Sequence, residues 1–237
     1  DASNMNTLAI KDGEHYIISG TKNWVTNGIH ADYIIVFALT KKGVGHKGIS
    51  CFIVEKGLPG FEMGKPENKL GIRSSDTCEL YYDNVRVTRE NLIGEEGEGF
   101  KIALATLDGG RIGIASQALG IAQASLNASV TYSNERIQFG KPISKNQTIQ
   151  FKIADMGMEI EAARLLIRQA AWKKDQNQNY GHLASIAKVY ASEVAMRAST
   201  QCVQIHGGFG YMRESGIERL MRDAKTVSYT HLTLPTS

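Results

Sequence analysis

Residues 1–95 consist of short apolar runs separated by polar breaks. The runs are rich in Ile, Val, Tyr and Phe, and Gly, Asn and Asp stand between them. This pattern predicts β-strands in the segments TLAIKDG, EHYIISG, KNWVTNG, DYIIVFALT, KGISCFIVEK, FEMGK, CELYYDN and VRV. The pair Asp12-Gly13 lies between two runs and is typical of a hairpin turn. Many short strands without intervening helices indicate an antiparallel β-barrel or sandwich.

The spacing of apolar residues becomes helical after the glycine-rich segment 94–99, which we take as a domain boundary. Between Gly97 and Gly140, apolar residues recur at intervals of three and four, as on one side of a helix. One predicted face comprises Leu104, Leu107, Arg111, Ile114, Ala118, Ala122 and Leu126, and an adjacent face comprises Ile112, Ala115, Leu119, Leu126 and Val130. A helix that is apolar around much of its circumference should be largely buried against other elements.

Three further helices are predicted, over residues 147–174, 181–206 and 217–225. The expected buried stripe of the first comprises Ile149, Ile153, Met156, Ile160, Ala163, Ile167 and Ala170. That of the second comprises Ile186, Tyr190, Val194, Ala198, Cys202 and Ile205, and Gly207-Gly208 should end this helix. Three long amphipathic helices with short connections predict an antiparallel bundle. The expected fold class is therefore α+β, with a β domain over 1–95 and a helical-bundle domain over 96–226.

The last eleven residues, VSYTHLTLPTS, have no helical period, although the preceding helix has no stop signal. One back-translation of this segment is similar to read-through of a transposon-end sequencing adapter. We therefore interpret residues 227–237 as a non-native tail and expect the natural chain to continue beyond Lys225. The alternative interpretation is a genuine disordered tail.

Composition excludes several classes of function. The chain has 237 residues, of which 42% are hydrophobic and 22% charged, as in soluble globular proteins. A net charge of +3 without a basic cluster does not indicate nucleic-acid binding. Cys51, Cys78 and Cys202 have wide, irregular spacing, which fits neither a disulfide framework nor a metal site and suggests a reducing compartment. No apolar run is long enough to span a membrane.

The segment Gly43-Val44-Gly45-His46-Lys47-Gly48 matches the dinucleotide-binding pattern GxGxxG. A dinucleotide site requires this loop between a parallel strand and a helix N-terminus, because the helix end binds the pyrophosphate. Here the loop connects one predicted strand to the next. We therefore interpret it as a hairpin connection.

The segment Asp108-Gly109-Gly110-Arg111 interrupts the first long helix. Two glycines inside a helix cost roughly 1 kcal/mol each relative to alanine, and a partly buried arginine requires an anionic partner. One interpretation is a close helix crossing with a structural ion pair. The other is that the glycines allow a ligand to approach the backbone, where Arg111 binds its negative charge.

Other residues are also open to two interpretations. Trp24 in a predicted strand is typical of a core residue, and Arg136 at the end of the long helix is typical of a solvated side chain. His206 could titrate near neutral pH, which suits a general base. It ends an apolar helix face, however, so we assign it no catalytic role.

Several long, ordered motifs resemble the acyl-CoA dehydrogenase family, and its short-chain (butyryl-CoA) branch most closely. These motifs are GTKNWVTNG, NKLGIRSSDT, DGGRIGIASQALGIAQ, ERIQFGKPISKNQTIQFKIADM, QIHGGFGY and ERLMRDAK. The resemblance covers Asp1 to about Lys225. It implies a middle β domain that is incomplete at its start and a truncated C-terminal helical domain, with the family's N-terminal helical domain absent.

The resemblance implies an FAD site and a substrate site. Trp24 and Thr26 match residues that contact the flavin ring, with Val25 between them, and Arg136 beside Phe139 matches the arginine that binds the FAD pyrophosphate, a role that suits a guanidinium. Further matches to FAD-contacting positions are Gln147, Gln204, Ile205, His206, Gly207 and Gly208. Some of these reach a neighbouring subunit's cofactor in the family, which implies a homo-oligomer, in the family a tetramer. Asp108, Gly109, Gly110 and Arg111 match the acyl-CoA contact segment.

The implied reaction is α,β-dehydrogenation of a short-chain fatty acyl-CoA to the trans-2-enoyl-CoA. A carboxylate removes an α-proton, a hydride passes to FAD, and an electron-transfer flavoprotein accepts the electrons. The implied location is the bacterial cytoplasm, or the mitochondrial matrix in a eukaryote. One family position for the catalytic glutamate aligns with Gly110, and the other falls by count at His231, inside the suspected tail. We therefore assign no catalytic residue and expect this chain itself to be inactive.

Two alternatives remain open. A relative acting on branched acyl-CoA would carry the same motifs. A non-enzymatic assembly module, made of a β domain and a helical bundle, would explain the architecture but neither the glycine pair beside Arg111 nor Trp24-Val25-Thr26.

Overall fold

The computed structural model describes residues 5–229 and divides them into two compact units. The first unit contains residues 5–69 and 73–106, and the second contains residues 70–72 and 107–229. Each unit is described by itself below. Within the described residues, no helix is long and apolar enough to cross a membrane.

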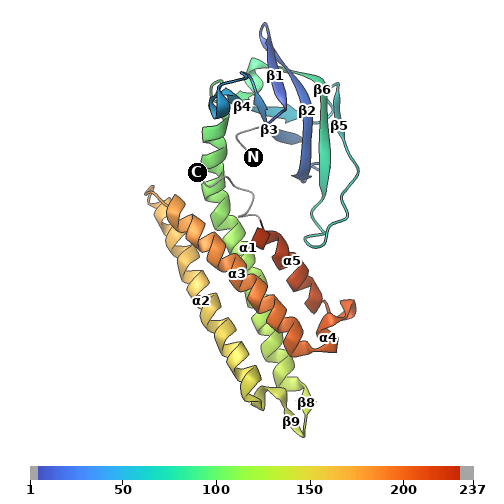
Figure 1. Cartoon of the computed structure of the whole chain (residues 1–237), viewed down its shortest axis with the longest axis vertical. Helices are drawn as coiled ribbons and strands as arrows, with labels where there is room; N and C mark the ends of the chain where they lie inside the picture. The colour runs from blue at the N-terminus through green and yellow to red at the C-terminus, as the bar shows by residue number, and fades with distance from the viewer. Residues whose placement is uncertain (1–4, 230–237) are drawn as a thin grey trace. The chain divides into compact units, whose positions relative to one another are not determined.

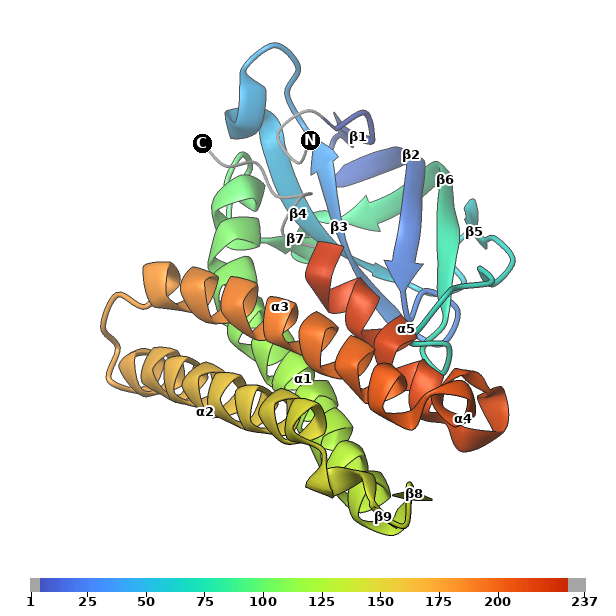
Figure 2. The same cartoon turned by 60° about the horizontal axis from the view of Figure 1, so that its bottom comes forward.

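The first unit is built on a seven-stranded sheet (Figure 2). In chain order the strands are β1 (Leu8–Asp12), β2 (His15–Thr26), β3 (Tyr33–Leu39), β4 (Ile49–Glu55), β5 (Phe61–Met63), β6 (Thr77–Thr88) and β7 (Leu92–Ile93). Their order in the sheet is β5-β6-β2-β1-β3-β4-β7. All neighbours pair antiparallel except β1 and β3, which pair in parallel at Leu8 and Leu39.

Two predicted connections in the sheet are confirmed. Asp12 of β1 pairs with His15 of β2, so a two-residue turn with Gly13 at φ +60° joins these strands. The GxGxxG segment connects β3 to the antiparallel strand β4 and contains a 3₁₀ turn, Gly45–Gly48. The segment is therefore a strand-to-strand connection and lacks the context of a dinucleotide site.

Two predicted strand breaks are absent. The segments EHYIISG and KNWVTNG form the single strand β2, and CELYYDN and VRV form the single strand β6. Gly20 and Asn84 have positive φ inside these strands, and the β2–β6 register shifts between Ile18 and Gly20. The polar and glycine positions that predicted turns thus produce irregularities within continuous strands, as in β-bulges.

The core of the first unit lies among β1, β2, β3, β4 and β6. Its largest fully buried side chains include Tyr16, Ile18, Phe52 and Leu80. The rings of Tyr16 and Phe52 meet edge to face, with centroids 5.0 Å apart. The Tyr16 hydroxyl donates a hydrogen bond of 2.5 Å to Glu96 Oε1, and burial together with this carboxylate raises the pKa of Tyr16 to about 12.

The second unit is a helical bundle, as expected (Figure 1). Its elements are α1 (Gly99–Glu135, which begins in the first unit), β8 (Ile137–Gln138), β9 (Lys141–Pro142), α2 (Gln147–Asp175), α3 (Gly181–His206), α4 (Gly208–Tyr211) and α5 (Ile217–Tyr229). The predicted bounds of α3 are confirmed and those of α2 are one residue short. This arrangement of a mostly antiparallel sheet followed by helices confirms the α+β class.

The predicted burial of α1 is wrong in part. Leu104 and Val130 are exposed, and the fully buried positions include Ala115, Ala118, Ala122, Ser125, Ser129 and Ser133. The Ser125 and Ser129 hydroxyls donate to backbone carbonyls four residues earlier in the helix, which satisfies both donors within α1. Small residues therefore form the contact face, where the backbone packs closely, and the larger apolar residues flank it.

Two other helical predictions need correction. Ile186 of α3 was expected to face inward but is 38% exposed, while Ala184 and Ala187 on either side are buried. Helix α5 continues past the predicted end at Lys225 to Tyr229, and Val227 is buried in the bundle core. The buried Lys188 ammonium donates a hydrogen bond of 2.9 Å to the Val227 carbonyl, which ties α3 to α5. Residues 230–237 of the suspected tail lie outside the described residues.

Candidate functional site

A hollow of about 650 Å³ lies in the second unit, where the end of α1 meets the end of α3. Its lining residues come from four short segments of the chain: Tyr132, Arg136, Gln138, Ile143, Ile205, His206, Gly207, Gly208 and Phe209. Five of these were singled out in the sequence, at positions 136 and 205–208. The fold therefore brings Arg136 to the same hollow as the segment that follows α3.

The backbone around Arg136 is held at both ends of a small hairpin. The Arg136 N–H donates to the Tyr132 carbonyl at 2.9 Å, and the Ile143 N–H donates to the Arg136 carbonyl at 2.9 Å. Strands β8 and β9 pair between these bonds, and Phe139 and Gly140 both have positive φ in the connecting turn. Two positive φ values match a type I′ hairpin turn. The Arg136 side chain itself is exposed, so its guanidinium is available to a ligand.

Two glycines keep the opposite wall of the hollow open. Gly207 has φ +59° at the end of α3, a conformation that side chains rarely adopt. A Cβ atom placed on Gly207 or on Gly208 would meet no atom within 4 Å. Both residues line the hollow, and without side chains their backbone is accessible there. A ligand can thus approach the backbone at this point.

Three stacked rings form the apolar part of the lining. The rings of Tyr132 and His206 stack with centroids 4.3 Å apart, and those of Tyr132 and Phe209 are nearly parallel at 5.9 Å. His206 is buried, and its Nδ1 lies 2.8 Å from the Cys202 carbonyl oxygen. That carbonyl can only accept, so Nδ1 carries a proton and donates. Burial lowers the pKa of His206, and the ring is therefore neutral at pH 7.

The neutral His206 should make stability depend on pH. Its pKa is lowered in the folded state, so the unfolded chain binds the proton more readily, and the free energy of unfolding falls as pH drops below about 6.5. When the pH is lowered from 7.5 to 5.5, we expect the melting temperature of His206→Gln to fall by less than that of the parent. Thermal melts at the two pH values measure this. An equal loss in both proteins would contradict a neutral, buried His206.

A second group of predicted residues lies in the first unit, at the end of β2. Trp24 is 73% exposed, which rules out the core interpretation. Its φ is +53°, and the β2–β6 register shifts between Lys22 and Val25, so the strand bulges here. Val25 is half-buried, whereas Thr26 is exposed. The bulge therefore presents an aromatic face and a hydroxyl to the outside of the sheet.

Asp76 organises the loop that follows this bulge. Its Oδ2 accepts a hydrogen bond of 2.8 Å from the Ile29 N–H, and its Oδ1 lies 2.8 Å from His30 Nδ1. The Asp76 carbonyl accepts from the N–H of Asn27, which has φ +59°. The Ile29 N–H and then His30 lower the pKa of the Asp76 carboxyl. Sequence reasoning missed this residue, although it lies in the quoted segment NKLGIRSSDT.

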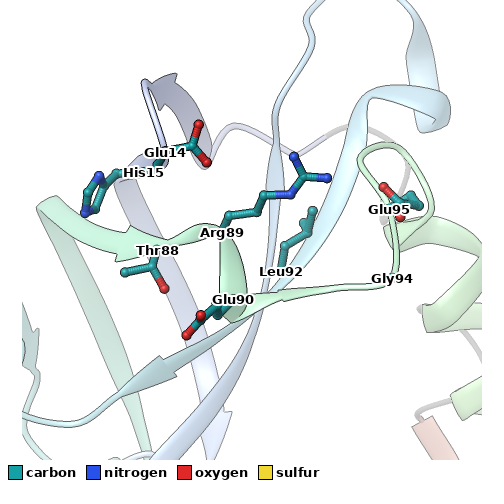
Figure 3. Close-up of a pocket in the computed structure, with 8 residues that line it drawn as sticks. All are labelled: Glu14, His15, Thr88, Arg89, Glu90, Leu92, Gly94 and Glu95. Atoms are coloured by element: carbon teal, nitrogen blue, oxygen red, sulfur yellow. The ribbon is translucent and has the colours of Figure 1, made fainter.

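A separate hollow of about 570 Å³ lies in the first unit (Figure 3). Its lining residues are Glu14, His15, Thr88, Arg89, Glu90, Leu92, Gly94 and Glu95. In Figure 3 the Arg89 side chain lies between those of Glu14 and Glu95. Three carboxylates beside one guanidinium would repel an anionic ligand. No residue singled out in the sequence lines this hollow, and we assign it no function.

Comparisons with known proteins identify the family. Residues 1–85 match the model of the acyl-CoA dehydrogenase middle domain, and residues 97–230 match that of the acyl-CoA dehydrogenase C-terminal domain. The chain belongs to the acyl-CoA dehydrogenase family. It is 55% identical to the short-chain specific acyl-CoA dehydrogenase of Megasphaera elsdenii, over 95% of this chain and 59% of that protein. It is 49% identical to the mitochondrial short-chain specific enzyme of Bos taurus, over 95% of this chain and 55% of that protein.

Solved structures agree with this assignment. The butyryl-CoA dehydrogenase of Megasphaera elsdenii matches with a TM-score of 0.96 and 53% identity, over 97% of this chain and 60% of that one. A chain from the structure of the electron transferring flavoprotein of Acidaminococcus fermentans matches with a TM-score of 0.93 and 49% identity, over 99% of this chain and 65% of that one. The chain thus spans about three fifths of the length of the relatives it matches.

The segment that the resemblance predicts to contact acyl-CoA, Asp108–Arg111, lies on α1. The Arg111 guanidinium pairs with Asp108 Oδ1 at 2.5 Å, which is the structural ion pair of the first interpretation. A Cβ on Gly109 would lie 3.3 Å from Lys174 Nζ, so the side chain of Lys174 on α2 reaches α1 here. A Cβ on Gly110 would meet no atom within 4 Å. Gly110 therefore leaves backbone open, as the second interpretation requires, and its role in substrate binding stays a prediction.

Besides Trp24, Val25 and Thr26 of the first unit, three residues predicted to contact the cofactor do not line the hollow. Phe139 is 93% exposed at the tip of the β8–β9 turn, and Gln147 and Gln204 are exposed on α2 and α3. The resemblance implies that some residues among Gln147 and Gln204–Gly208 reach a neighbouring subunit's cofactor, and a single chain cannot display those contacts. His231, the counted position of the catalytic glutamate, lies outside the described residues.

Sequence reasoning missed four residues of the lining: Tyr132, Gln138, Ile143 and Phe209. Tyr132 precedes Arg136 by one helical turn, so both lie on the same side of the chain as it leaves α1. Phe209 directly follows the glycine pair. Tyr132 could therefore have been predicted from its closeness in sequence to Arg136, and Phe209 from its closeness to Gly208.

Proposed function

We propose that the protein is an FAD-dependent acyl-CoA dehydrogenase that oxidises a short-chain acyl-CoA to the trans-2-enoyl-CoA. The observation that carries the proposal is the hollow of the second unit, with one arginine at a hairpin, two glycines without side chains and a wall of rings. A dinucleotide cofactor has both anionic and flat apolar parts. The donor chemistry and the open glycine wall suit such a group.

In this proposal Arg136 binds the FAD pyrophosphate, because a forked guanidinium forms two charge-assisted hydrogen bonds with phosphate oxygens. Gly207 and Gly208 allow the cofactor to approach the backbone, and Ile205 and His206 support it from α3. Phe139, Gln147 and Gln204 would also contact FAD, and some residues among Gln147 and Gln204–Gly208 would reach the cofactor of a neighbouring subunit. Trp24 covers one face of a flavin ring and Thr26 donates a hydrogen bond to it. Bound FAD supplies a two-electron acceptor.

The substrate proposal places the acyl-CoA at Asp108–Arg111. The open backbone at Gly110 provides room for the thioester, and the ion pair with Asp108 fixes the direction of the Arg111 guanidinium. Short-chain specificity is supported by relatives that are named for it in Megasphaera elsdenii, Clostridium acetobutylicum and Bos taurus.

The proposed partners follow the same relatives. An electron-transfer flavoprotein is the proposed electron acceptor, supported by the likeness to a chain from the electron transferring flavoprotein structure of Acidaminococcus fermentans. The protein assembles as a homo-oligomer, which completes cofactor sites that a single chain leaves exposed. It acts in the bacterial cytoplasm, or in the mitochondrial matrix if its source is a eukaryote.

Binding of acyl-CoA to the FAD-loaded chain tests the substrate class. Calorimetry with butyryl-, octanoyl- and isovaleryl-CoA should rank butyryl-CoA first, with about fivefold tighter binding than either of the others, a difference of about 1 kcal/mol. Tighter binding of isovaleryl-CoA would favour the branched-chain alternative. Absence of binding by all three would contradict the enzyme proposal and favour an assembly module.

A further inference from the structure

Trp24 and Thr26 lie outside the packed core of the first unit. Trp24 is 73% exposed, and Thr26 is exposed as well. Exposed side chains change rotamer freely, so their directions depend chiefly on the backbone that carries them. An aromatic face and a hydroxyl act on a flavin ring only when both are correctly oriented. The hydrogen bonds that hold this backbone therefore decide how well the contact with the ring is prepared.

The bulge in β2 leaves part of this backbone without partners in the sheet. In the β2–β6 register, Asn23 and Trp24 together oppose Glu79 alone. The Trp24 N–H donates to Asn23 Oδ1 at 3.1 Å, which is a bond within the bulge itself. Pairing with β6 resumes at Val25 and ends at Thr26, the last residue of β2. The support of the bulge is thus completed by the turn that follows Thr26.

Asp76 holds this turn from the residue that precedes β6. Its carbonyl accepts a hydrogen bond of 3.0 Å from the Asn27 N–H, which extends the pairing by one residue beyond Thr26. Its carboxylate accepts from the Ile29 N–H at 2.8 Å and lies 2.8 Å from His30 Nδ1. The Asp76 side chain is only 11% exposed, whereas that of His30 is 80% exposed. One enclosed side chain and its carbonyl thus fix the segment 27–30 at three points.

The other contacts of the turn support the same geometry less directly. A Cβ on Gly28 would lie 2.7 Å from Cys78 Sγ, so the turn lies against the core and has little room to shift inward. The Ile29 carbonyl accepts from Lys56 Nζ at 2.7 Å. Lys56 is exposed and its ammonium is carried on a flexible four-carbon stem, so it orients the peptide poorly. Loss of the Asp76 carboxylate should therefore loosen the turn most.

We propose that Asp76 is a positioning residue of the flavin site, which fixes the turn 27–30 and through it the directions of Thr26 and Trp24. The inference rests on the proposed contact of these two residues with FAD. Asp76 acts through the backbone and needs no contact with the cofactor. A carboxylate suits this role, because one oxygen accepts from a backbone N–H while the other binds a ring nitrogen. A role confined to stability would leave the mobility of Trp24 and the affinity for FAD unchanged in a folded variant.

The test uses the full chain with Trp172→Phe, which leaves Trp24 as its only tryptophan. Fluorescence anisotropy of Trp24 without FAD reports the order of the bulge, and quenching of its emission by added FAD reports binding beside it. In this background Asp76→Ala should lower the anisotropy and raise the dissociation constant for FAD about tenfold, because preorganisation is lost. Asp76→Asn keeps an oxygen acceptor for the Ile29 N–H, so it should remain within about threefold of the parent.

Asp32→Ala is the matched control, because Asp32 is an exposed aspartate close to the same turn. Within residues 5–229 its carboxylate has no ion pair. This variant should leave both readings unchanged, and circular dichroism verifies that each variant folds. A folded Asp76→Ala that matches Asp32→Ala in anisotropy and in FAD affinity would overturn the proposal.

His30→Ala keeps the question open to a decision if Asp76→Ala does not fold. It removes one contact of the Asp76 carboxylate at an exposed position, so the chain should fold. Lower anisotropy and about threefold weaker FAD binding would support the proposal, and no change in either would overturn it. A parent whose Trp24 emission FAD does not quench would instead contradict the proposed flavin contact. The two failures are therefore distinguishable.

Discussion

Replacement of Arg136 by alanine should weaken FAD binding about tenfold to a hundredfold. A charge-assisted hydrogen bond from a guanidinium contributes roughly 1.5–3 kcal/mol, which corresponds to this range. The change should leave the fold intact, because the Arg136 side chain is exposed and its backbone is held by bonds to Tyr132 and Ile143. Equilibrium dialysis with FAD measures the effect directly.

Three further variants sharpen this prediction. Arg136→Lys keeps the positive charge but loses the two parallel N–H donors of the guanidinium. Its affinity for FAD should therefore lie between those of the parent and Arg136→Ala. Arg213→Ala removes an exposed arginine outside the hollow and should change nothing. A Cβ on Gly208 would meet no atom within 4 Å, so Gly208→Ala should fold normally, and its methyl group should weaken FAD binding in the hollow. If Arg136→Ala binds FAD as tightly as Arg213→Ala does, the assignment of Arg136 is wrong.

Replacement of Gly48 by alanine should destabilise the first unit by about 2–3 kcal/mol. A Cβ on Gly48 would lie 1.9 Å from the Lys41 carbonyl oxygen, and Gly48 is buried. The same connection is fixed by bonds from the Thr40 and Lys41 N–H groups to the Gly48 carbonyl, so the backbone cannot move aside cheaply. For a unit of this size the melting temperature should fall by about 10 °C or more.

Gly113→Ala in α1 provides the matched control for Gly48→Ala. A Cβ on Gly113 would meet no atom within 4 Å and its backbone is helical, so alanine should stabilise the chain slightly, by up to about 1 kcal/mol. Calorimetric melts compare the two variants with the parent. A melting temperature for Gly48→Ala within about 2 °C of the parent would show that the β3–β4 connection is looser than described.

The long helices were predictable because two signals coincide in them. In α3, apolar residues recur at helical spacing from Gly181 onward, and Gly207 then adopts a conformation that ends the helix. The burial of α1 was not predictable to the same extent, because periodicity finds an apolar side but not the distance of the neighbouring helix. Close packing against α1 selects Ala118, Ala122 and Ser125 over the larger residues beside them.

Strand boundaries were predicted less well for a physical reason. A glycine or asparagine between apolar runs fits a turn, but it also fits a bulge in a continuous strand. Gly20 illustrates this, because a Cβ there would lie 2.9 Å from Thr7 and its φ is +144°. The residue is required by a close approach within the sheet. The sequence around it does not contain that information.

The candidate site was predictable only as separate segments. The resemblance to the family singled out Arg136 and the pair Gly207-Gly208, which are far apart in the sequence. Their meeting at one hollow depends on α1 and α3 ending at the same end of the bundle. The stacking of Tyr132 on His206 depends on the same packing, and no spacing in the sequence predicts it.

Hydrogen exchange of the chain with and without FAD tests the central claim most directly. If FAD binds in the hollow of the second unit, amides in residues 132–138 and 205–209 should exchange more slowly when FAD is added. Residues 24–26 should also become protected if Trp24 and Thr26 contact the flavin ring. Protection confined to residues 14–15 and 88–95, which line the other hollow, or no protection of residues 132–138 and 205–209, would contradict the account.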